Sequence, residues 1–121
     1  MVKSHTGIIA IIIGFIPHKY HNLRALLDLV KDGTIPQSEA TAEMKAKWAT
    51  QIRQCVGRLH ELGIIWGDIK TDNVIIDENG DAVILDFGGG NTQGWVDEEM
   101  YGTGEGDLQG LDKIMKTLGQ E

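Results

Sequence analysis

The sequence predicts an α+β fold that is mainly helical, and three observations lead to this class. A continuous β-branched apolar run covers residues 7–14. Two short apolar runs, at 74–76 and 82–85, flank an Asn-Gly pair, which is a strong signal for a β-hairpin. Elsewhere, apolar residues recur at helical spacing in longer segments that end at glycine. The 121 residues are predicted to form a single domain, 1–121.

The first apolar run predicts a strand over residues 8–16 that is covered on both faces, and Pro17 ends it. A bilayer span needs about 20 residues, which is roughly twice the length of this run. A single Lys3 precedes it and no small-residue cleavage pattern follows, so it does not resemble a signal peptide.

Three helices are predicted, over residues 22–33, 38–63 and 105–119. Asn22 is the expected N-cap of the first helix, and Gly33 ends it. In the second helix the apolar stripe is formed by Trp48, Ile52, Val56, Leu59 and Leu62. In the third the stripe is formed by Leu108, Leu111, Met115 and Leu118.

The segment 74–85 is predicted to be a hairpin that brings metal ligands together. If residues 79–80 form a two-residue turn, counting outward places Asp86 directly opposite Asn73. Asp68 lies five residues before Asn73 and adds another oxygen. Carboxylate and amide oxygens suit Mg²⁺, which completes its shell with water and phosphates. The alternative is a polar loop with capping carboxylates.

The loop 66–73 contains groups suited to phosphoryl transfer. Asp68 would orient an attacking hydroxyl, and Lys70 would neutralise charge on the transferring phosphoryl group. For Lys70, a structural salt bridge is an equally weighted alternative.

Composition limits the class of partner. The formal net charge of −7 argues against nucleic acid and anionic membranes, but local charge can still favour a phosphate ligand. Cys55 is the single cysteine, which indicates a reducing, cytoplasmic environment and an inert core thiol. The four histidines lack metal-ligand spacing, and His60 is expected to pack or hydrogen-bond at its helix end.

The segment from Leu59 to Asn73 resembles the end of the αE helix and the catalytic loop of eukaryotic protein kinases, in the serine/threonine form Asp-x-Lys-x-x-Asn. Asp86-Phe87-Gly88 is similar to the family's magnesium-binding motif. The resemblance implies ATP and Mg²⁺ as cofactors. It also implies catalytic roles for Asp68 and Lys70, and Asn73 and Asp86 as metal ligands.

The resemblance extends over about residues 8–118. Ile13 looks like the gatekeeper of a hinge strand, and backbone groups of Gly14, Phe15 and Ile16 would meet adenine. Residues 86–104 resemble a short activation segment, with Glu99 at its conserved glutamate. The start of the last predicted helix resembles αF, which implies that Asp107 anchors the backbone of the catalytic loop.

The chain also departs from the family pattern. Trp66-Gly67-Asp68 replaces His-Arg-Asp, and a Gly before the Asp also occurs in aminoglycoside- and choline-type kinases. No glycine-rich loop, Val-Ala-Ile-Lys lysine or helix beyond αF is found. The chain is therefore expected to be a truncated C-lobe, weak or inactive alone, that an N-lobe from another segment or chain completes.

Three hypotheses follow: a phosphotransferase core, a pseudokinase-type binding module and a relative of small-molecule kinases. The expected partners are a nucleotide and a protein substrate or the missing N-lobe. Because part of the last apolar stripe would be uncovered, a homodimer through exposed helix faces is also expected.

Overall fold

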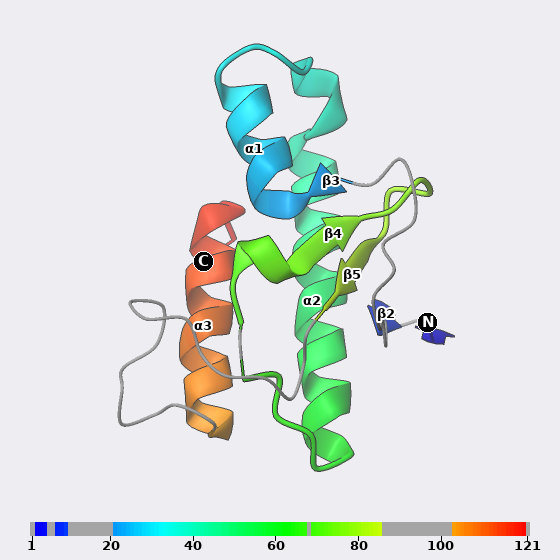
Figure 1. The fold of residues 1–121 in the computed structure, drawn as a ribbon, viewed down its shortest axis with the longest axis vertical. Coiled ribbons are helices and arrows are strands. Elements are labelled where there is room, and N and C mark those ends of the chain that lie inside the picture. The colour runs from blue at the N-terminus through cyan, green and yellow to red at the C-terminus, as the bar shows by residue number, and fades with distance from the viewer. Residues whose placement is uncertain (1, 5–6, 10–20, 68, 86–102, 121) are drawn as a thin grey trace.

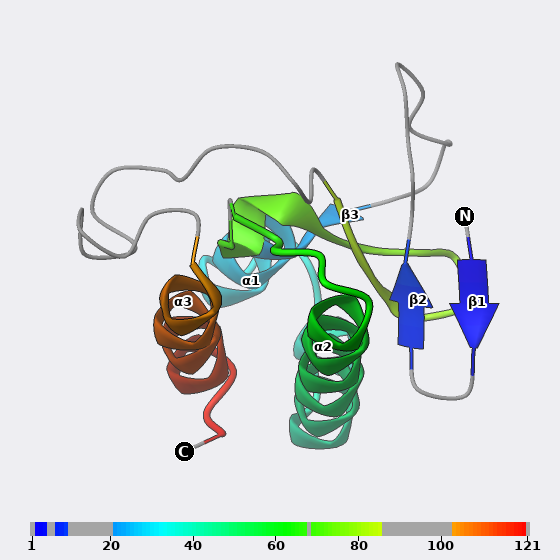
Figure 2. The same ribbon diagram turned by 90° about the horizontal axis from the view of Figure 1, so that it is seen from below.

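The computed structural model describes residues 2–4, 7–9, 21–67, 69–85 and 103–120, and these form a mainly helical α+β structure, as predicted. Helix α2 lies between α3 and the strand pair β1–β2 (Figure 1, Figure 2). In chain order the elements are β1 (Val2–Ser4), β2 (Gly7–Ile9), β3 (His21–Asn22), α1 (Leu23–Lys31), the 3₁₀ helix η1 (Gln37–Glu39), α2 (Ala42–Glu61), the 3₁₀ helix η2 (Thr71–Asn73), β4 (Val74–Ile76), β5 (Ala82–Ile84) and α3 (Gly104–Thr117).

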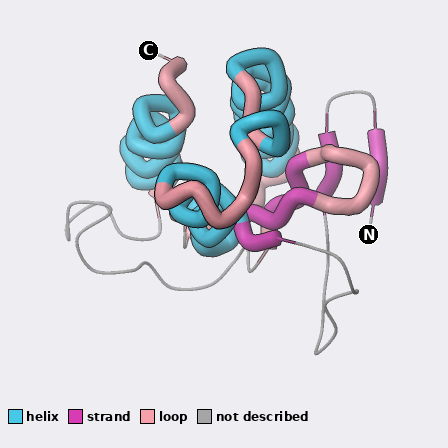
Figure 3. The backbone as a smooth tube through the Cα atoms, turned by 90° about the horizontal axis from the view of Figure 1, so that it is seen from above, coloured by secondary structure: helices cyan, strands magenta, loops and turns pink. Residues whose placement is uncertain are grey.

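The described strands form one sheet in the order β1-β2-β5-β4-β3. They gather beside the helices (Figure 3). β4 and β5 pair antiparallel, which confirms the predicted hairpin, and β2 lies parallel to β5. Of the strand predicted over 8–16, the structure describes a strand at residues 7–9, and residues 10–16 lie outside the described residues.

The predicted two-residue turn of the hairpin is wrong by one residue. Ile76 pairs with Ala82, so the loop is residues 78–80, and the Asp77 main-chain N–H donates to Asp81. The Asp77 carboxylate accepts the N–H groups of Asn79 and Asp81, both at 2.9 Å, and these bonds favour the longer loop. Gly80 has a φ of +79°, which only a glycine adopts without strain.

This register changes the geometry expected at the open end of the hairpin. The residue opposite Asn73 is Leu85, whose N–H donates to the Asn73 carbonyl at 2.8 Å. The prediction that Asp86 lies directly opposite Asn73 is therefore wrong, because one extra loop residue shifts every partner by one. Asp86 itself lies outside the described residues.

The first two helices begin at side-chain caps. Asn22 caps α1 as predicted, since its Oδ1 accepts the Ala25 N–H at 3.2 Å. Helix α2 begins at Ala42 rather than near Ser38 because Thr41 is its cap and residues 37–39 form a separate 3₁₀ turn. None of the helices in the described residues is long and apolar enough to cross a membrane.

The core lies between α2, the hairpin and α3. The largest fully buried side chains are Trp48, Trp66, Leu23, Ile52, Leu59, Ile69, Ile84, Ile114, Leu118, Val56 and Val74. Leu62, which was placed on the buried stripe of α2, is 58% exposed because it follows the last helical residue.

The apolar stripe predicted for α3 is confirmed at Met115 and Leu118, which are buried, while Leu111 is partly buried against the core, so part of the stripe is uncovered as expected. Leu108 is 55% exposed, whereas Asp107, Gly110 and Ile114 are buried. Asp107 and Gly110 are buried because they contact the loop before η2. Hydrophobic periodicity does not predict such a tertiary contact. The helix begins at Gly104, with Thr103 as its cap.

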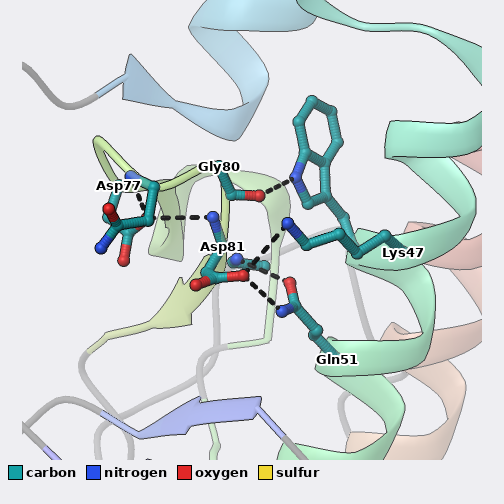
Figure 4. A network of polar contacts seen from close by, with 8 residues as sticks. Lys47, Gln51, Asp77, Gly80 and Asp81 are labelled. Carbon is teal, nitrogen blue, oxygen red and sulfur yellow. Dashed lines mark hydrogen bonds and ion pairs between the residues drawn. The ribbon is translucent and has the colours of Figure 1, made fainter.

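The hairpin loop is fastened to α2 by a polar network (Figure 4). Gln51 donates to Asp81 and accepts from the Ala82 N–H, both at 2.9 Å. Lys47 forms an ion pair with Asp81 at 3.1 Å, and the Trp48 indole donates to the Gly80 carbonyl at 2.9 Å. The loop end of the hairpin is thus held on α2. Its open end, where β4 begins, follows η2 directly in the chain.

Candidate functional site

A buried carboxylate holds the loop that leads to the candidate site. Asp107 of α3 is 1% exposed and accepts the main-chain N–H groups of Trp66 at 2.7 Å and Gly67 at 2.9 Å. Its Oδ2 also lies 2.8 Å from Nε2 of His60, at the end of α2. The anchoring role expected for Asp107, and the hydrogen bond expected for His60, are both confirmed.

The residue after Asp68 is held by the same helix. Ile69 is buried and lies against Gly110, where an added Cβ would come within 2.1 Å of its Cγ2 atom. Gly110 is therefore required by close packing, since any side chain would push this loop away from α3. Both chain neighbours of Asp68, Gly67 and Ile69, are thus fixed by α3.

A second set of bonds joins this loop to the end of the hairpin. The buried Trp66 indole donates to the Leu85 carbonyl at 2.8 Å, and the Leu85 N–H donates to Asn73. The backbone just before Asp86 is therefore tied both to the loop and to Asn73. Sequence analysis does not predict this bond; the signal that could have indicated it is that a buried indole N–H needs an acceptor.

The structure describes two of the predicted site side chains. Asn73 is buried, 8% exposed, and its main-chain N–H donates to the Lys70 carbonyl at 3.0 Å. Lys70 is partly buried and precedes η2 in extended conformation. Asp68, Asp86 and the adenine-contacting residues Gly14, Phe15 and Ile16 lie outside the described residues. Their roles stay predictions.

Two residues at the start of α1 contact η2, and the sequence interpretation assigned neither contact. The Asn22 side-chain amide donates to the Asp72 carbonyl. Arg24 forms an ion pair with the Asp72 carboxylate at 3.3 Å. Residue spacing along the sequence does not predict these contacts, because their partners are 50 and 48 residues apart.

The residue types at this point are those that magnesium binds. Asn73 has an amide oxygen, and Leu85, which is bonded to Asn73, is followed in the sequence by Asp86, a carboxylate outside the described residues. Oxygen donors of this kind, combined with water and phosphate, are those that Mg²⁺ takes. Within the described residues no group of three His, Cys, Asp or Glu side chains offers a competing site.

Comparison with known proteins agrees with this geometry. The family model described as "Protein kinase domain" matches residues 3–102. The chain is similar to serine/threonine-protein kinase PKH3 of Eremothecium gossypii, with 33% identity over 102 residues, which are 78% of this chain and 13% of that protein. It is also 31% identical over 68 residues to serine/threonine-protein kinase Sgk1-B of Xenopus laevis, covering 52% of this chain and 16% of that protein.

A third relative is serine/threonine-protein kinase kin-29 of Caenorhabditis briggsae, with 32% identity over 57 residues, 47% of this chain and 7% of that protein. The chain therefore spans less than a fifth of these curated relatives. No solved structure matches it.

Proposed function

Because this chain belongs to the protein kinase family, we propose that it is a phosphotransferase core that uses ATP and Mg²⁺ to phosphorylate a hydroxyl group. The observation that supports the proposal most is the network through Asp107, Trp66 and Leu85. It immobilises the direct neighbours of Asp68 and Asp86. Phosphoryl transfer depends mainly on such positioning and on electrostatics.

In this proposal each residue has one task. Asp68 accepts the hydrogen bond of the acceptor hydroxyl and takes its proton as the hydroxyl oxygen bonds to the γ-phosphorus of ATP. The bond from that phosphorus to the β–γ bridging oxygen breaks, and ADP leaves. Lys70 stabilises negative charge on the phosphoryl oxygens. Asn73 and Asp86 hold Mg²⁺, which, when bound with ATP, neutralises charge between the phosphates.

The nucleotide would lie against residues 14–16, whose backbone groups meet the adenine ring. The protein would act inside the cell, as a single-cysteine sequence suggests. We expect slow transfer or none from these 121 residues alone, because the sequence has no Val-Ala-Ile-Lys lysine to clamp the α- and β-phosphates. A glycine-rich N-lobe supplied by another segment or chain would raise the rate.

A radiolabelled ATP assay with a mixed peptide and small-molecule acceptor set tests the proposal. It compares the chain with the Asp68→Asn variant, which keeps side-chain size and removes the base. We expect the variant to lose activity by about 100-fold or more. The matched control is Asp112→Asn on the exposed side of α3, which should leave the rate unchanged.

Transfer that is measurable and equal for the chain and for Asp68→Asn contradicts the proposal. If neither protein shows transfer, the calorimetry with ATP and Mg²⁺ described below decides. The acceptor set also separates protein kinases from small-molecule kinases, to which the Gly67-Asp68 pair points. Phosphorylation of aminoglycosides or choline-like alcohols, but of no peptide, would assign the chain to the second group.

A second candidate function is a pseudokinase-type binding module, and one observation favours it. Leu108 is 55% exposed and lines a hollow of about 230 Å³ on α3, together with Leu111, Met115, Asp112, Arg53 and Gln120. A hollow that combines apolar and charged side chains in this way suits a protein partner, including a second copy of the chain. Calorimetry with millimolar ATP and Mg²⁺ discriminates the two functions, because a module of this type would bind neither.

A further inference from the structure

The side chain of Asn22 serves two structures at the same time. Its Oδ1 accepts the Ala25 N–H at 3.2 Å and so caps α1. Its Nδ2 donates to the Asp72 carbonyl, in the middle of η2. An aspartate, serine or threonine would cap the helix as well, but none has an amide donor that could make the second bond in this geometry. The presence of an asparagine at position 22 is therefore explained by its bond to η2, because other residue types would cap α1 as well.

The contact is reinforced by neighbours on both sides. Asn22 also lies in β3, paired with Ile75 of β4, so its backbone is fixed next to the strand that follows η2. Two residues further on, in the first turn of α1, Arg24 pairs with the Asp72 carboxylate at 3.3 Å. The Arg24 side chain is 63% exposed, so this ion pair adds little by itself. Of these two polar contacts, the Asn22 bond is the one that is partly buried.

The residue that follows Asp72 is Asn73. Its main-chain N–H is bonded to Lys70 and its carbonyl to Leu85, so η2 is a short unit whose orientation sets the direction of the Asn73 side chain. A donor fixed on the Asp72 carbonyl restrains the peptide unit that joins Asp72 to Asn73. Residues that orient a metal ligand from outside the ligand set commonly change metal affinity when mutated.

We propose that Asn22 is a positioning residue that locks η2 and thereby holds the Asn73 amide in the geometry that binds the metal. This inference rests on the proposed function, because it takes Asn73 as a metal ligand. It adds the start of α1 to the machinery of the site, at a position far from the loop in sequence.

The test uses the Asn22→Asp variant of the full chain. The carboxylate keeps the helix cap and suits the helix N-terminus, but it removes the donor and sets a negative oxygen against the Asp72 carbonyl. The matched control is Gln54→Glu, which makes the same charge change on an exposed residue of α2. If Asn22→Asp does not fold, Asn22→Ser keeps a cap without adding charge.

Two readouts are needed, one of which requires no metal. Hydrogen exchange at the Asn73 main-chain N–H should be about tenfold faster in Asn22→Asp, while exchange at the Met44 N–H, which bonds to Thr41, stays unchanged. Mn²⁺ titration followed by paramagnetic broadening of the Asn73 resonances should show about tenfold weaker binding. Gln54→Glu should change neither.

Each outcome decides a different point. Unchanged hydrogen exchange at the Asn73 main-chain N–H overturns the proposal that Asn22 holds η2. Faster exchange at Asn73 with unchanged Mn²⁺ affinity overturns the proposal that the contact of Asn22 with η2 positions the metal ligand. If the unmodified chain binds no Mn²⁺ at Asn73, the proposed metal site fails, and the exchange data alone decide whether Asn22 holds η2.

Discussion

At the scale of single residues, Asp107 is the most deeply buried carboxylate among the residues that the structure describes. A carboxylate that is 1% exposed is stable only if its oxygens are hydrogen-bonded, and here two main-chain N–H groups and His60 satisfy them. The same bonds hold the loop that precedes Asp68. Stability of the fold and geometry of the candidate site therefore depend on one side chain.

Replacement of Asp107 by Asn should lower the free energy of unfolding by about 2–4 kcal/mol, because the amide nitrogen would face N–H donors and the charge-assisted bonds would be lost. Urea denaturation measures this value. Asp112→Asn on the same helix breaks only an exposed ion pair with Lys116 and should cost less than about 1 kcal/mol. Equal losses from the two variants would show that Asp107 is no special anchor.

At the scale of elements, α3 and α2 present a matched pair of helical glycines. Gly110 is buried against Ile69, whereas an added Cβ at Gly57 of α2 would meet nothing within 4 Å. Replacement of a helical glycine by alanine is favourable by about 0.5–1 kcal/mol where space allows. The two positions should therefore respond with opposite sign.

Gly110→Ala should destabilise the chain by about 1–3 kcal/mol through overpacking at Ile69, while Gly57→Ala should stabilise it. Thermal unfolding of both variants provides the comparison. Because the clash lies next to Asp68, Gly110→Ala should also reduce any transferase activity, and Gly57→Ala should not. A gain in stability at Gly110 would contradict the close contact between α3 and the loop.

The hairpin provides the second prediction at this scale. Gln51→Ala removes the two hydrogen bonds that Gln51 makes to Asp81 and Ala82 and should cost about 1–3 kcal/mol, since it leaves the Ala82 N–H without its partner. Gln54→Ala, an exposed residue of the same type on the same helix, should change stability by less than about 0.5 kcal/mol. Denaturation midpoints of the pair test whether the network in Figure 4 fastens the hairpin.

At the scale of the whole molecule, the hollow beside the exposed Leu108 is the feature that bears on assembly. Leu108 lines it, while Leu62 is similarly exposed but does not line it. If the hollow binds a second copy of the chain, burial of Leu108 contributes to association. Loss of an equally exposed leucine elsewhere would not affect the dimer.

Leu108→Ser should weaken self-association at least tenfold, as expected where burial of one leucine is worth about 1.5–3 kcal/mol, whereas Leu62→Ser should leave it unchanged. Sedimentation velocity over a concentration series measures the dissociation constant. A chain that stays monomeric at high concentration, or a dimer insensitive to Leu108, would remove this face from consideration as a homodimer interface.

The local sequence pattern was sufficient to predict much of the fold. Short-range propensity placed the helices and the hairpin, and the caps and glycine ends followed from backbone hydrogen bonding near Asn22 and Gly63. The role of Asp107 came from a resemblance in motif, which the structure then confirmed. The exact register of the hairpin could not be predicted from local pattern. The Asp77 carboxylate accepts two loop N–H groups, and these bonds favour one more loop residue.

The sequence by itself determined the class of the fold, the family and the residue types available for metal and phosphate chemistry, since these depend on composition and spacing along the chain. Only the tertiary structure decided that Asp107 and Gly110 of α3 are buried, how the Trp66 indole reaches Leu85, and that Asn22 reaches η2. The physical reason is that these contacts join groups 19 to 50 residues apart. Their energies depend on close approach in space, which no local pattern encodes.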